Sequence, residues 1–398
     1  MKNNATDGFV APGFESVFDT FRDNFRHRGE LGGAVAVYRG DECLVDLWGG
    51  VADRHSGISW QRDTAVLIFS ATKGMTGLTL ALAHSRGLFD YDEPVARYWP
   101  EFAQQGKENI TVRQLLCHQA GLAVIDEVLT LDILADRDRR DAVLAKQRPA
   151  WTPGEHHGYH TTSFGFYAAA LMRRCDTQGR GVAAYFADEI ARPLGIDFWI
   201  GLPHNFPRSR IASIHSRPPW TMPDFRALPF AMMWSALNPK SLTMRSFRNP
   251  EVKRVTDLNS PMFWHLEHPS TIGIGEVRAV ARAYAEFASG GAKLEINRGT
   301  LNAIETVATP RAGTFDLVLR MERNLSPGFA KPTSRHKFGL SNRAYGAAGL
   351  GGSFGFADPD LGIGFAYAPN RLGVHIADDP REKALRDAVY RCLIAERK

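Results

Sequence analysis

The same two elements, an amphipathic helix and a β-hairpin, are predicted at both ends of the chain. Near the N-terminus, periodic apolar residues predict a helix over 13–28, and apolar runs at 33–38 and 43–48 predict an antiparallel hairpin. Near the C-terminus, a hairpin is predicted over 353–367 and a closing helix over 385–393. Because one sheet buries the apolar faces of both helix and hairpin pairs, the two ends are expected to build one α/β domain together.

The middle of the chain has a different character. Helical segments alternate with long loops over 90–265, and 203–270, which includes the Pro- and Trp-containing stretch 218–223, is mostly irregular and apolar. We therefore predict an α/β (α+β) fold in which 1–89 and 266–398 form an antiparallel sheet flanked by helices, with a mainly helical domain inserted between them. A long apolar insertion of this kind typically covers a binding site, and the alternative is an ordered segment packed on the core.

Composition argues against several classes of function. The 48 Lys and Arg residues are dispersed among 43 acidic residues, so no nucleic-acid partner is expected. No apolar run approaches the length of a membrane span and residues 1–8 lack the apolar core of a signal peptide, so we expect a cytoplasmic protein with no membrane partner. The cysteines are far apart, and His156, His157 and His160 follow no metal-ligand spacing, so no metal and no organic cofactor is expected.

A serine and a lysine three residues apart begin the clearest helical pattern in the chain. Ser70 lies in the first turn, near backbone N–H groups without helical partners, and Lys73 lies beside it one turn later. The face of this helix that carries Ser70 and Lys73 has otherwise only small residues, so the helix is predicted to be buried on all sides. A lysine buried on this face has a lowered pKa and accepts a proton near neutral pH. Ser70 is therefore a candidate nucleophile and Lys73 its base; the alternative is a capping serine beside a snorkelling lysine.

Two other serines imitate catalytic motifs without the context that those motifs need. Ser334 and Lys337 repeat the S-x-x-K spacing, but they lie in a basic segment without a helical pattern and are predicted in a surface loop. Ser353 is the serine of a G-x-S-x-G sequence, the nucleophile elbow of α/β-hydrolases, which needs a strand before the serine and a helix after it. A hairpin follows here, so Ser353 is not predicted to be the nucleophile.

Two further stretches have the residues of an acyl-transfer site. Tyr159 ends a loop of turn-forming residues that begins at Trp151, and it is a candidate proton relay; the alternative is a packing tyrosine. The glycines of 349–352 allow a strand edge to approach a substrate and to direct a backbone N–H at an oxyanion.

Five segments, spread over nearly the whole chain, occur in the order of one known family. They are Phe69–Gly74, Tyr91–Pro100, Ile110–Leu122, Trp151–His160 and Gly351–Pro359. Together they resemble the serine β-lactamase-like superfamily, and within it the class C β-lactamase-like carboxylesterases known as family VIII esterases. The resemblance implies the split β-lactamase/penicillin-binding-protein-like fold described above.

The resemblance also implies roles for particular residues. Ser70 is the nucleophile, Lys73 its base partner and Tyr159 the proton relay, and the oxyanion hole uses the N–H groups of Ser70 and Leu350. The residues expected to contact the substrate are Gly349, Gly351, His160 and Trp234.

The chain departs from the family at one motif. Where β-lactamases have Lys-Thr-Gly, and many related esterases have histidine or tryptophan before the glycine, this chain has Ala347, Ala348 and Gly349. The absence of a cationic or aromatic side chain at this motif weakens recognition of a carboxylate, favours neutral esters and leaves Tyr159 with less electrostatic support. Arg343 and Lys337 are candidate substitutes.

We therefore expect a serine hydrolase that cleaves short-chain or aromatic carboxylic esters through an acyl-enzyme on Ser70. The partner is a small-molecule ester, and the oligomeric state stays open. The alternatives are a β-lactamase or D-amino-acid peptidase, an acyltransferase, and a non-catalytic scaffold with the same fold.

Overall fold

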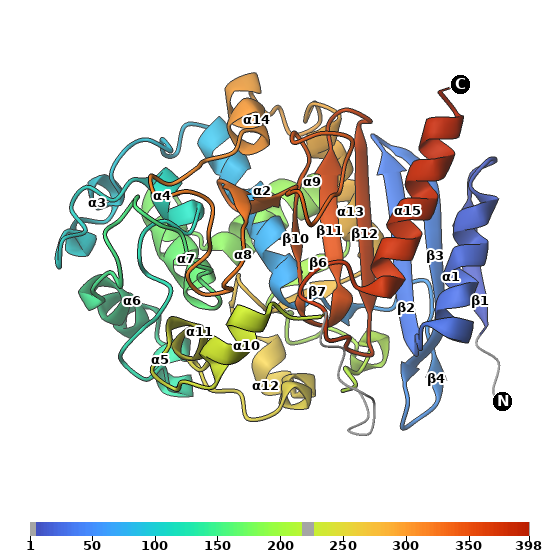
Figure 1. Ribbon diagram of the computed structural model, residues 1–398, viewed down its shortest axis with the longest axis horizontal. Coiled ribbons are helices and arrows are strands. Elements are labelled where there is room, and N and C mark those ends of the chain that lie inside the picture. The colour runs from blue at the N-terminus through green and yellow to red at the C-terminus, as the bar shows by residue number, and fades with distance from the viewer. Residues whose placement is uncertain (1–4, 217–226, 398) are drawn as a thin grey trace.

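A large antiparallel sheet forms one part of the computed structural model, which describes residues 5–216 and 227–397 (Figure 1). Its strand order is β1-β3-β2-β12-β11-β10-β9-β8, and β4 pairs with β3. The strands are β1 (Thr6–Val10), β2 (Gly32–Arg39), β3 (Glu42–Asp53), β4 (Ile58–Ser59), β8 (Asn324–Ser326), β9 (Phe329–Lys331), β10 (Tyr345–Ala348), β11 (Phe354–Asp358) and β12 (Ile363–Pro369). A smaller sheet has the order β5-β7-β6, formed by β5 (Val66–Leu67), β6 (Phe198–Ile200) and β7 (Gly273–Gly275).

Both ends of the chain contribute to the large sheet, as predicted. Strand β12 pairs with β2 from Ile363 opposite Arg39 to Pro369 opposite Gly33, so the C-terminal hairpin continues the N-terminal one. The α/β fold with an antiparallel sheet flanked by helices is therefore confirmed. Strand β1 was not predicted, because its five residues are mostly exposed and have no apolar alternation.

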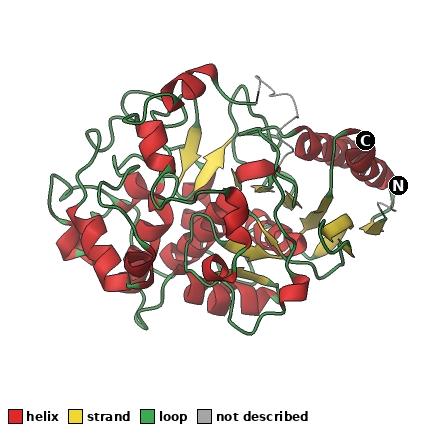
Figure 2. Ribbon diagram, turned by 90° about the horizontal axis from the view of Figure 1, so that it is seen from below, coloured by secondary structure: helices red, strands yellow, loops and turns green. Residues whose placement is uncertain are grey.

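Helices cover both faces of the sheet and form the rest of the molecule (Figures 1 and 2). They are α1 (Glu15–His27), α2 (Thr72–Ser85), α3 (Val95–Tyr98), α4 (Val112–Leu116), α5 (Leu131–Ala135), α6 (Arg137–Lys146), α7 (Ser163–Cys175), α8 (Val182–Phe186), α9 (Arg192–Leu194), α10 (Phe230–Ala236), α11 (Leu242–Phe247), α12 (Pro261–Trp264), α13 (Val277–Ala288), α14 (Arg298–Glu305) and α15 (Pro380–Ala395). Short 3-10 turns are η1 (Phe69–Ala71), η2 (Pro100–Phe102), η4 (Arg208–Arg210), η5 (Val255–Asn259) and η6 (Leu350–Gly352), and η3 (Ala187–Ala191) is a π-helical turn.

The two terminal helices pack side by side on one face of the sheet, and α13 packs on the other (Figure 1). Apolar residues of α1, such as Val17 and Phe21, share a core with Leu385 and Val389 of α15 and with the sheet. A second and larger core lies on the α13 side and extends through the helical part of the molecule. The inserted helices are therefore joined to the sheet by continuous apolar packing.

The segment 203–270 is more regular than predicted. Three short helices, α10, α11 and α12, lie in it, and each is too short to show a helical period in sequence. Prolines mark two of their starts, because Pro229 precedes α10 and Pro261 opens α12. The stretch 218–223 lies outside the described residues, as do residues 1–4 of the N-terminal stretch.

Helix α2 runs through the centre of the molecule (Figure 1) and is buried on all sides from Thr72 to Ala83, as its sequence pattern predicts. Two glycines allow this close packing. A methyl group added at Gly74 would lie 1.8 Å from the hydroxyl oxygen of Tyr284, and one at Gly77 would lie 2.7 Å from the ring of Phe329. The neighbouring elements therefore fix the position of the helix that follows Ser70.

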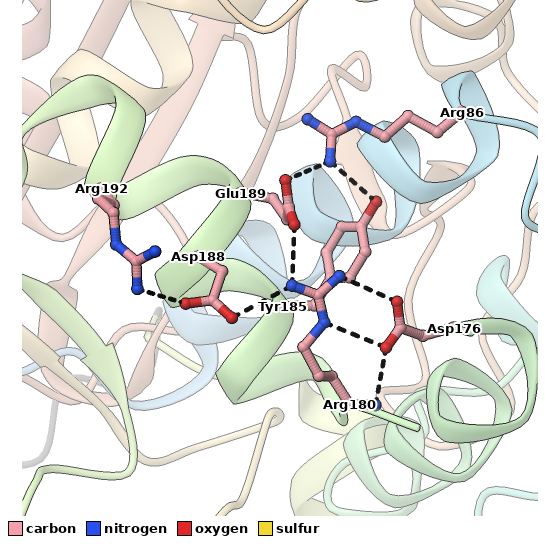
Figure 3. Close-up of polar contacts among 7 residues, drawn as sticks. All are labelled: Arg86, Asp176, Arg180, Tyr185, Asp188, Glu189 and Arg192. Carbon is pink, nitrogen blue, oxygen red and sulfur yellow. Dashed lines mark hydrogen bonds and ion pairs between the residues drawn. The ribbon is translucent and has the colours of Figure 1, made fainter. Parts of the chain in front are cut away.

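A network of charged side chains ties the C-terminal end of α2 to the helices beside it (Figure 3). Arg86, just past α2, donates hydrogen bonds to Glu189 and to the hydroxyl of Tyr185. Arg180 donates to Asp176 at 3.0 Å, to Asp188 at 3.1 Å and to Glu189 at 2.8 Å. Both ends of α2 are thus anchored.

In the part of the chain that the structure describes, no helix has the length and apolar character needed to cross a membrane.

Candidate active site

A pocket of about 230 Å³ brings Ser70, Lys73 and Tyr159 together. It opens between the N-terminal end of α2, strands β8 to β10 and the loop that contains Tyr159. Apolar side chains form much of its wall, and they include Leu228, Met232, Phe247, Leu319 and Met321. Ser70 and Lys73 come from one segment and Tyr159 from another far along the sequence, and the fold places all three in one cavity.

Ser70 lies on the 3-10 turn η1 directly before α2. The preceding residue, Phe69, has a φ of 50°, which is unusual for a bulky side chain. Such left-handed conformations store backbone strain and persist where the surrounding structure holds them, often at functional sites. The first N–H groups of a helical segment have no intrahelical acceptor, so the Ser70 N–H is available to a ligand.

The amine of Lys73 makes three hydrogen bonds. Its Nζ donates to Ser70 Oγ at 3.3 Å, to the carbonyl oxygen of Thr161 at 2.7 Å and to that of Ser270 at 3.1 Å. Burial lowers the pKa of Lys73, and nearby Tyr159 offsets this only in part. A neutral amine has two protons for the two carbonyl groups and one lone pair for the Ser70 hydroxyl. The arrangement is therefore suited to accept the Ser70 proton.

Tyr159 lines the pocket beside Lys73. The Lys73 Nζ is 4.7 Å from the centroid of its ring. Burial alone would raise the pKa of Tyr159, but the charge of Lys73 and hydrogen bonds with Lys73 and Ser70 outweigh burial, and the pKa of Tyr159 is lowered overall. A phenol in this position can exchange a proton with both Lys73 and Ser70.

Two short helical turns, η1 and η6, meet at the mouth of the pocket. Leu350 is the first residue of η6 and lines the pocket beside Gly349, and its N–H, like that of Ser70 in η1, belongs to the start of a helical turn. The hydroxyl of Ser353 is buried and donates to the carbonyl oxygen of Ile68 at 2.8 Å, which holds the two turns together. The Ser353 hydroxyl therefore has a structural role. Ser334 and Lys337, the second S-x-x-K pair, are exposed in a loop.

We predict that Gly349→Ala lowers hydrolytic activity by at least about 100-fold, the loss seen when one oxyanion donor is removed. An added Cβ would lie 2.2 Å from the Ile68 carbonyl oxygen and 2.3 Å from Ser353 Oγ, so η6 must move away from η1. The measurement is kcat/KM for a chromogenic ester together with the thermal unfolding midpoint. Gly362→Ala is the control for lost stability, because its φ of 64° strains any side chain although no atom lies within 4 Å of the added Cβ; equal losses of activity in the two variants would contradict the prediction.

Three of the residues predicted to contact the substrate lie outside the pocket lining. The ring of His160 is fully buried; its Nε2 accepts from the Leu122 N–H and its Nδ1 donates to the carbonyl oxygen of Gly158. Trp234 on α10 is 69% exposed, while Met232 of the same helix lines the pocket. Gly351 has a φ of 87° and packs against Leu372. The family motifs place such residues near the site but do not give the direction of their side chains.

His118 is a pocket residue that the sequence analysis missed. It follows α4 with a φ of 59°, and its ring lies 5.4 Å from that of Tyr159. Its carbonyl oxygen accepts from the Gly158 N–H and its Nδ1 accepts from the His160 N–H. His118 thus holds the loop on both sides of Tyr159. Its only signal in the sequence was its place in the segment Ile110–Leu122.

The cations expected to replace the missing one are not in the pocket. Arg343 pairs with Glu305 and Asp360, each at 2.7 Å, and Lys337 is exposed. Two other cations line the pocket instead, Lys331 and Arg323. The Lys331 amine donates to backbone carbonyl oxygens, and burial lowers its pKa to about 7. The guanidinium of Arg323 lies 5.1 Å from the ring centroid of Tyr159.

The fold and the serine, lysine and tyrosine in one pocket define the class of serine hydrolases related to β-lactamases and penicillin-binding proteins. The chain belongs to the Beta-lactamase family, whose family model matches residues 19–389. It is 34% identical over 372 residues to Esterase/beta-lactamase LipL of Mycobacterium tuberculosis, a match that covers 92% of this chain and 83% of LipL.

Two solved structures are similar over almost the whole chain. The crystal structure of a family VIII carboxylesterase superposes with a TM-score of 0.86 at 31% identity and covers 98% of this chain and 100% of that one. A penicillin-binding protein homolog from Caulobacter crescentus superposes with a TM-score of 0.84 at 32% identity, with the same coverage of the two chains. The resemblance stated from the sequence motifs is thereby confirmed.

Proposed function

We propose that the protein is a carboxylesterase that acts on short-chain or aromatic esters. Lys73, together with Tyr159, takes the proton of the Ser70 hydroxyl as Oγ attacks the ester carbonyl carbon. The N–H groups of Ser70 and Leu350 stabilise the oxyanion. The bond to the alkoxy oxygen breaks and the alcohol leaves with the proton held by Lys73 and Tyr159. Water then gives a proton to Lys73 and Tyr159 and attacks the acyl carbon, the bond to Ser70 Oγ breaks, and Oγ takes the proton back as the carboxylic acid is released.

The observation that carries this proposal is the 3.3 Å contact between Lys73 Nζ and Ser70 Oγ inside a cavity. A nucleophile within hydrogen-bond reach of a base, with that base oriented by further groups, is the geometry of nucleophilic catalysis. Here the carbonyl groups of Thr161 and Ser270 orient the lysine. The names of LipL and the family VIII carboxylesterase support ester hydrolysis in particular.

The lining of the pocket favours neutral, apolar substrates. Ala347 occupies the wall where β-lactamases have a cationic motif, and it offers no hydrogen-bond donor from its side chain. Met232, Phe247 and Met321 form an apolar wall beside Ser70, and flexible methionine side chains adapt to acyl groups of different shape. We infer that this wall accepts the acyl group.

A β-lactamase activity is the second candidate, because LipL is named as a β-lactamase as well as an esterase and the Caulobacter crescentus homolog is named for penicillin binding. The test compares 4-nitrophenyl acetate, butyrate and benzoate with a chromogenic cephalosporin. We expect kcat/KM to be more than about 100-fold higher for the esters, because the cephalosporin carboxylate lacks its usual partner. A higher value for the cephalosporin would overturn the choice of ester. Partition of the acyl group to an added alcohol instead of water would identify an acyltransferase.

Two variants of helix α10 give a matched control for the acyl wall. Met232→Ala is expected to lower kcat/KM for the butyrate by about tenfold, because Met232 lines the pocket. Trp234→Ala is expected to leave it unchanged, since this side chain is largely exposed. The reverse order of effects would place the acyl group against a different wall.

A further inference from the structure

Tyr159 lacks the cation that the third motif supplies in related enzymes, so the groups that surround it decide its chemistry. The charged and titratable groups around Tyr159 and Arg323 are Lys73, His118, His157, His160, Asp316, Glu322, Lys331 and His336. The Lys331 amine donates to the carbonyl oxygens of Glu305 and Arg343 and lies over the ring of Tyr345. Burial lowers the pKa of each of the four histidines, to about 4 for His160 and for His336. These histidines are neutral near pH 7, and Lys73 is neutral when it acts as a base.

Asp316 fixes the backbone of Tyr159. Its side chain is fully buried, and Oδ1 accepts from the N–H of Tyr159 at 3.1 Å, of Val318 at 2.9 Å and of Leu319 at 2.8 Å. The backbone of Asp316 is itself held, because its N–H donates to Met321 and its carbonyl oxygen accepts from Arg320. One carboxylate therefore joins the tyrosine loop to the segment 314–323.

Arg323 ends that segment with its charge directed at Tyr159. The guanidinium carbon lies 5.1 Å from the ring centroid, a distance at which cation–π attraction operates. Nη1 lies 3.7 Å from Asp316 Oδ2, and neither atom has a hydrogen-bond partner among the described residues. Since Asp316 Oδ1 already accepts three N–H groups, the Arg323 charge is only loosely paired. Arginine remains protonated at any pH at which the enzyme works.

We propose that Arg323, which lies beside Asp316, is the residue that positions and polarises Tyr159 during proton transfer, in place of the cation that Ala347 does not supply. The assignment rests on the proposed function of Ser70, Lys73 and Tyr159. Arg323 acts through Tyr159 and Lys73 and is a positioning residue.

Its charge acts on both partners in the same direction. For Lys73, burial is the main cause of the lowered pKa, and the Arg323 charge lowers it further. For Tyr159, burial raises the pKa, and Arg323 is one of the groups that together lower it. Removing the cation therefore raises the pKa of both residues, so that the base loses its proton only at higher pH.

The test measures the rate at which a neutral phosphonate labels Ser70, by intact-protein mass spectrometry across pH. Arg323→Gln is expected to slow labelling at pH 7 by about tenfold, which is less than the loss of an acid–base group itself because Lys73 and Tyr159 remain, and to move its half-maximal rate to higher pH. Arg323→Lys keeps the charge and is expected to keep the wild-type pH of half-maximal labelling. Arg320→Gln is the matched control, because this arginine of the same segment lies over Phe315 at 5.1 Å and outside the pocket lining.

A second variant separates this role from folding. Asp316→Asn keeps an oxygen to accept the three N–H groups but removes the anion that partly offsets the Arg323 charge. A half-maximal labelling rate at lower pH, with an unchanged unfolding midpoint, supports the proposal, and a shift to higher pH contradicts it. An unshifted pH profile in Arg323→Gln, or an equal shift in Arg320→Gln, overturns it while the function of Ser70 stands. No labelling of Ser70 in the wild type overturns the proposed function and this assignment together.

Discussion

Ser70→Ala is expected to lower ester hydrolysis by about 10⁴-fold or more, because removal of a nucleophile leaves only binding and oxyanion stabilisation. It is also expected to abolish the mass shift that a phosphonate or ester produces in the wild-type protein. Ser70 Oγ is the hydroxyl that the Lys73 amine contacts, at 3.3 Å, and it lies in the pocket with Tyr159. Intact-protein mass spectrometry after exposure to the phosphonate measures the adduct directly.

Ser353→Ala is the matched control, since Ser353 stands in the competing G-x-S-x-G sequence. Its hydroxyl already donates to the Ile68 carbonyl oxygen at 2.8 Å. Its loss is expected to cost about 1 kcal/mol of stability, the usual value of one hydrogen bond, and to leave the adduct in place. An adduct that disappears only in Ser353→Ala would move the nucleophile to that residue. An unlabelled wild-type protein would favour the non-catalytic scaffold.

The fold was predictable because the apolar residues of its main helices and strands recur at regular spacings. Two hairpins and two terminal helices alternate in the sequence as they do in the structure, and β12 pairs with β2 as their shared sheet requires. Ser70 and Lys73 were predictable for the same reason, since a helix fixes the distance between positions three apart. The context of each motif also separated Ser70 from Ser353 and Ser334.

The rest of the site depends on contacts that the spacing of apolar residues in the sequence does not reveal. Asp316 and Arg323 lie in an irregular segment, and only the folded chain brings them to Tyr159. Arg343 is closer than Arg323 in sequence to the third motif, yet Glu305 and Asp360 hold it elsewhere. His160 adjoins Tyr159 but turns its ring into buried backbone contacts. Sequence distance is therefore a poor guide to which charge faces a catalytic group.

Lys73 tests whether the site needs a base or only a cation. Lys73→Met removes both and is expected to lower kcat/KM by about 10³-fold, within the range of general-base contributions. Lys73→Arg keeps the positive charge but is expected to lose about as much, because a guanidinium does not release its proton near neutral pH. Steady-state hydrolysis of a 4-nitrophenyl ester across pH measures both variants. A kcat/KM of Lys73→Arg well above that of Lys73→Met would show that Lys73 acts through its charge.

The pH profile of the wild-type protein gives the same test without a substitution. A base must be neutral to accept the Ser70 proton, so activity rises as the pH passes the pKa of Lys73. Burial lowers that pKa, and the partial compensation by Tyr159 leaves it below the usual value for lysine. The acidic limb of kcat/KM is therefore expected at lower pH than an exposed lysine would set, and it should be absent from Lys73→Met. If the acidic limb persists in Lys73→Met, another group titrates there. The role of Lys73 would then be structural, through its hydrogen bonds to the carbonyl oxygens of Thr161 and Ser270.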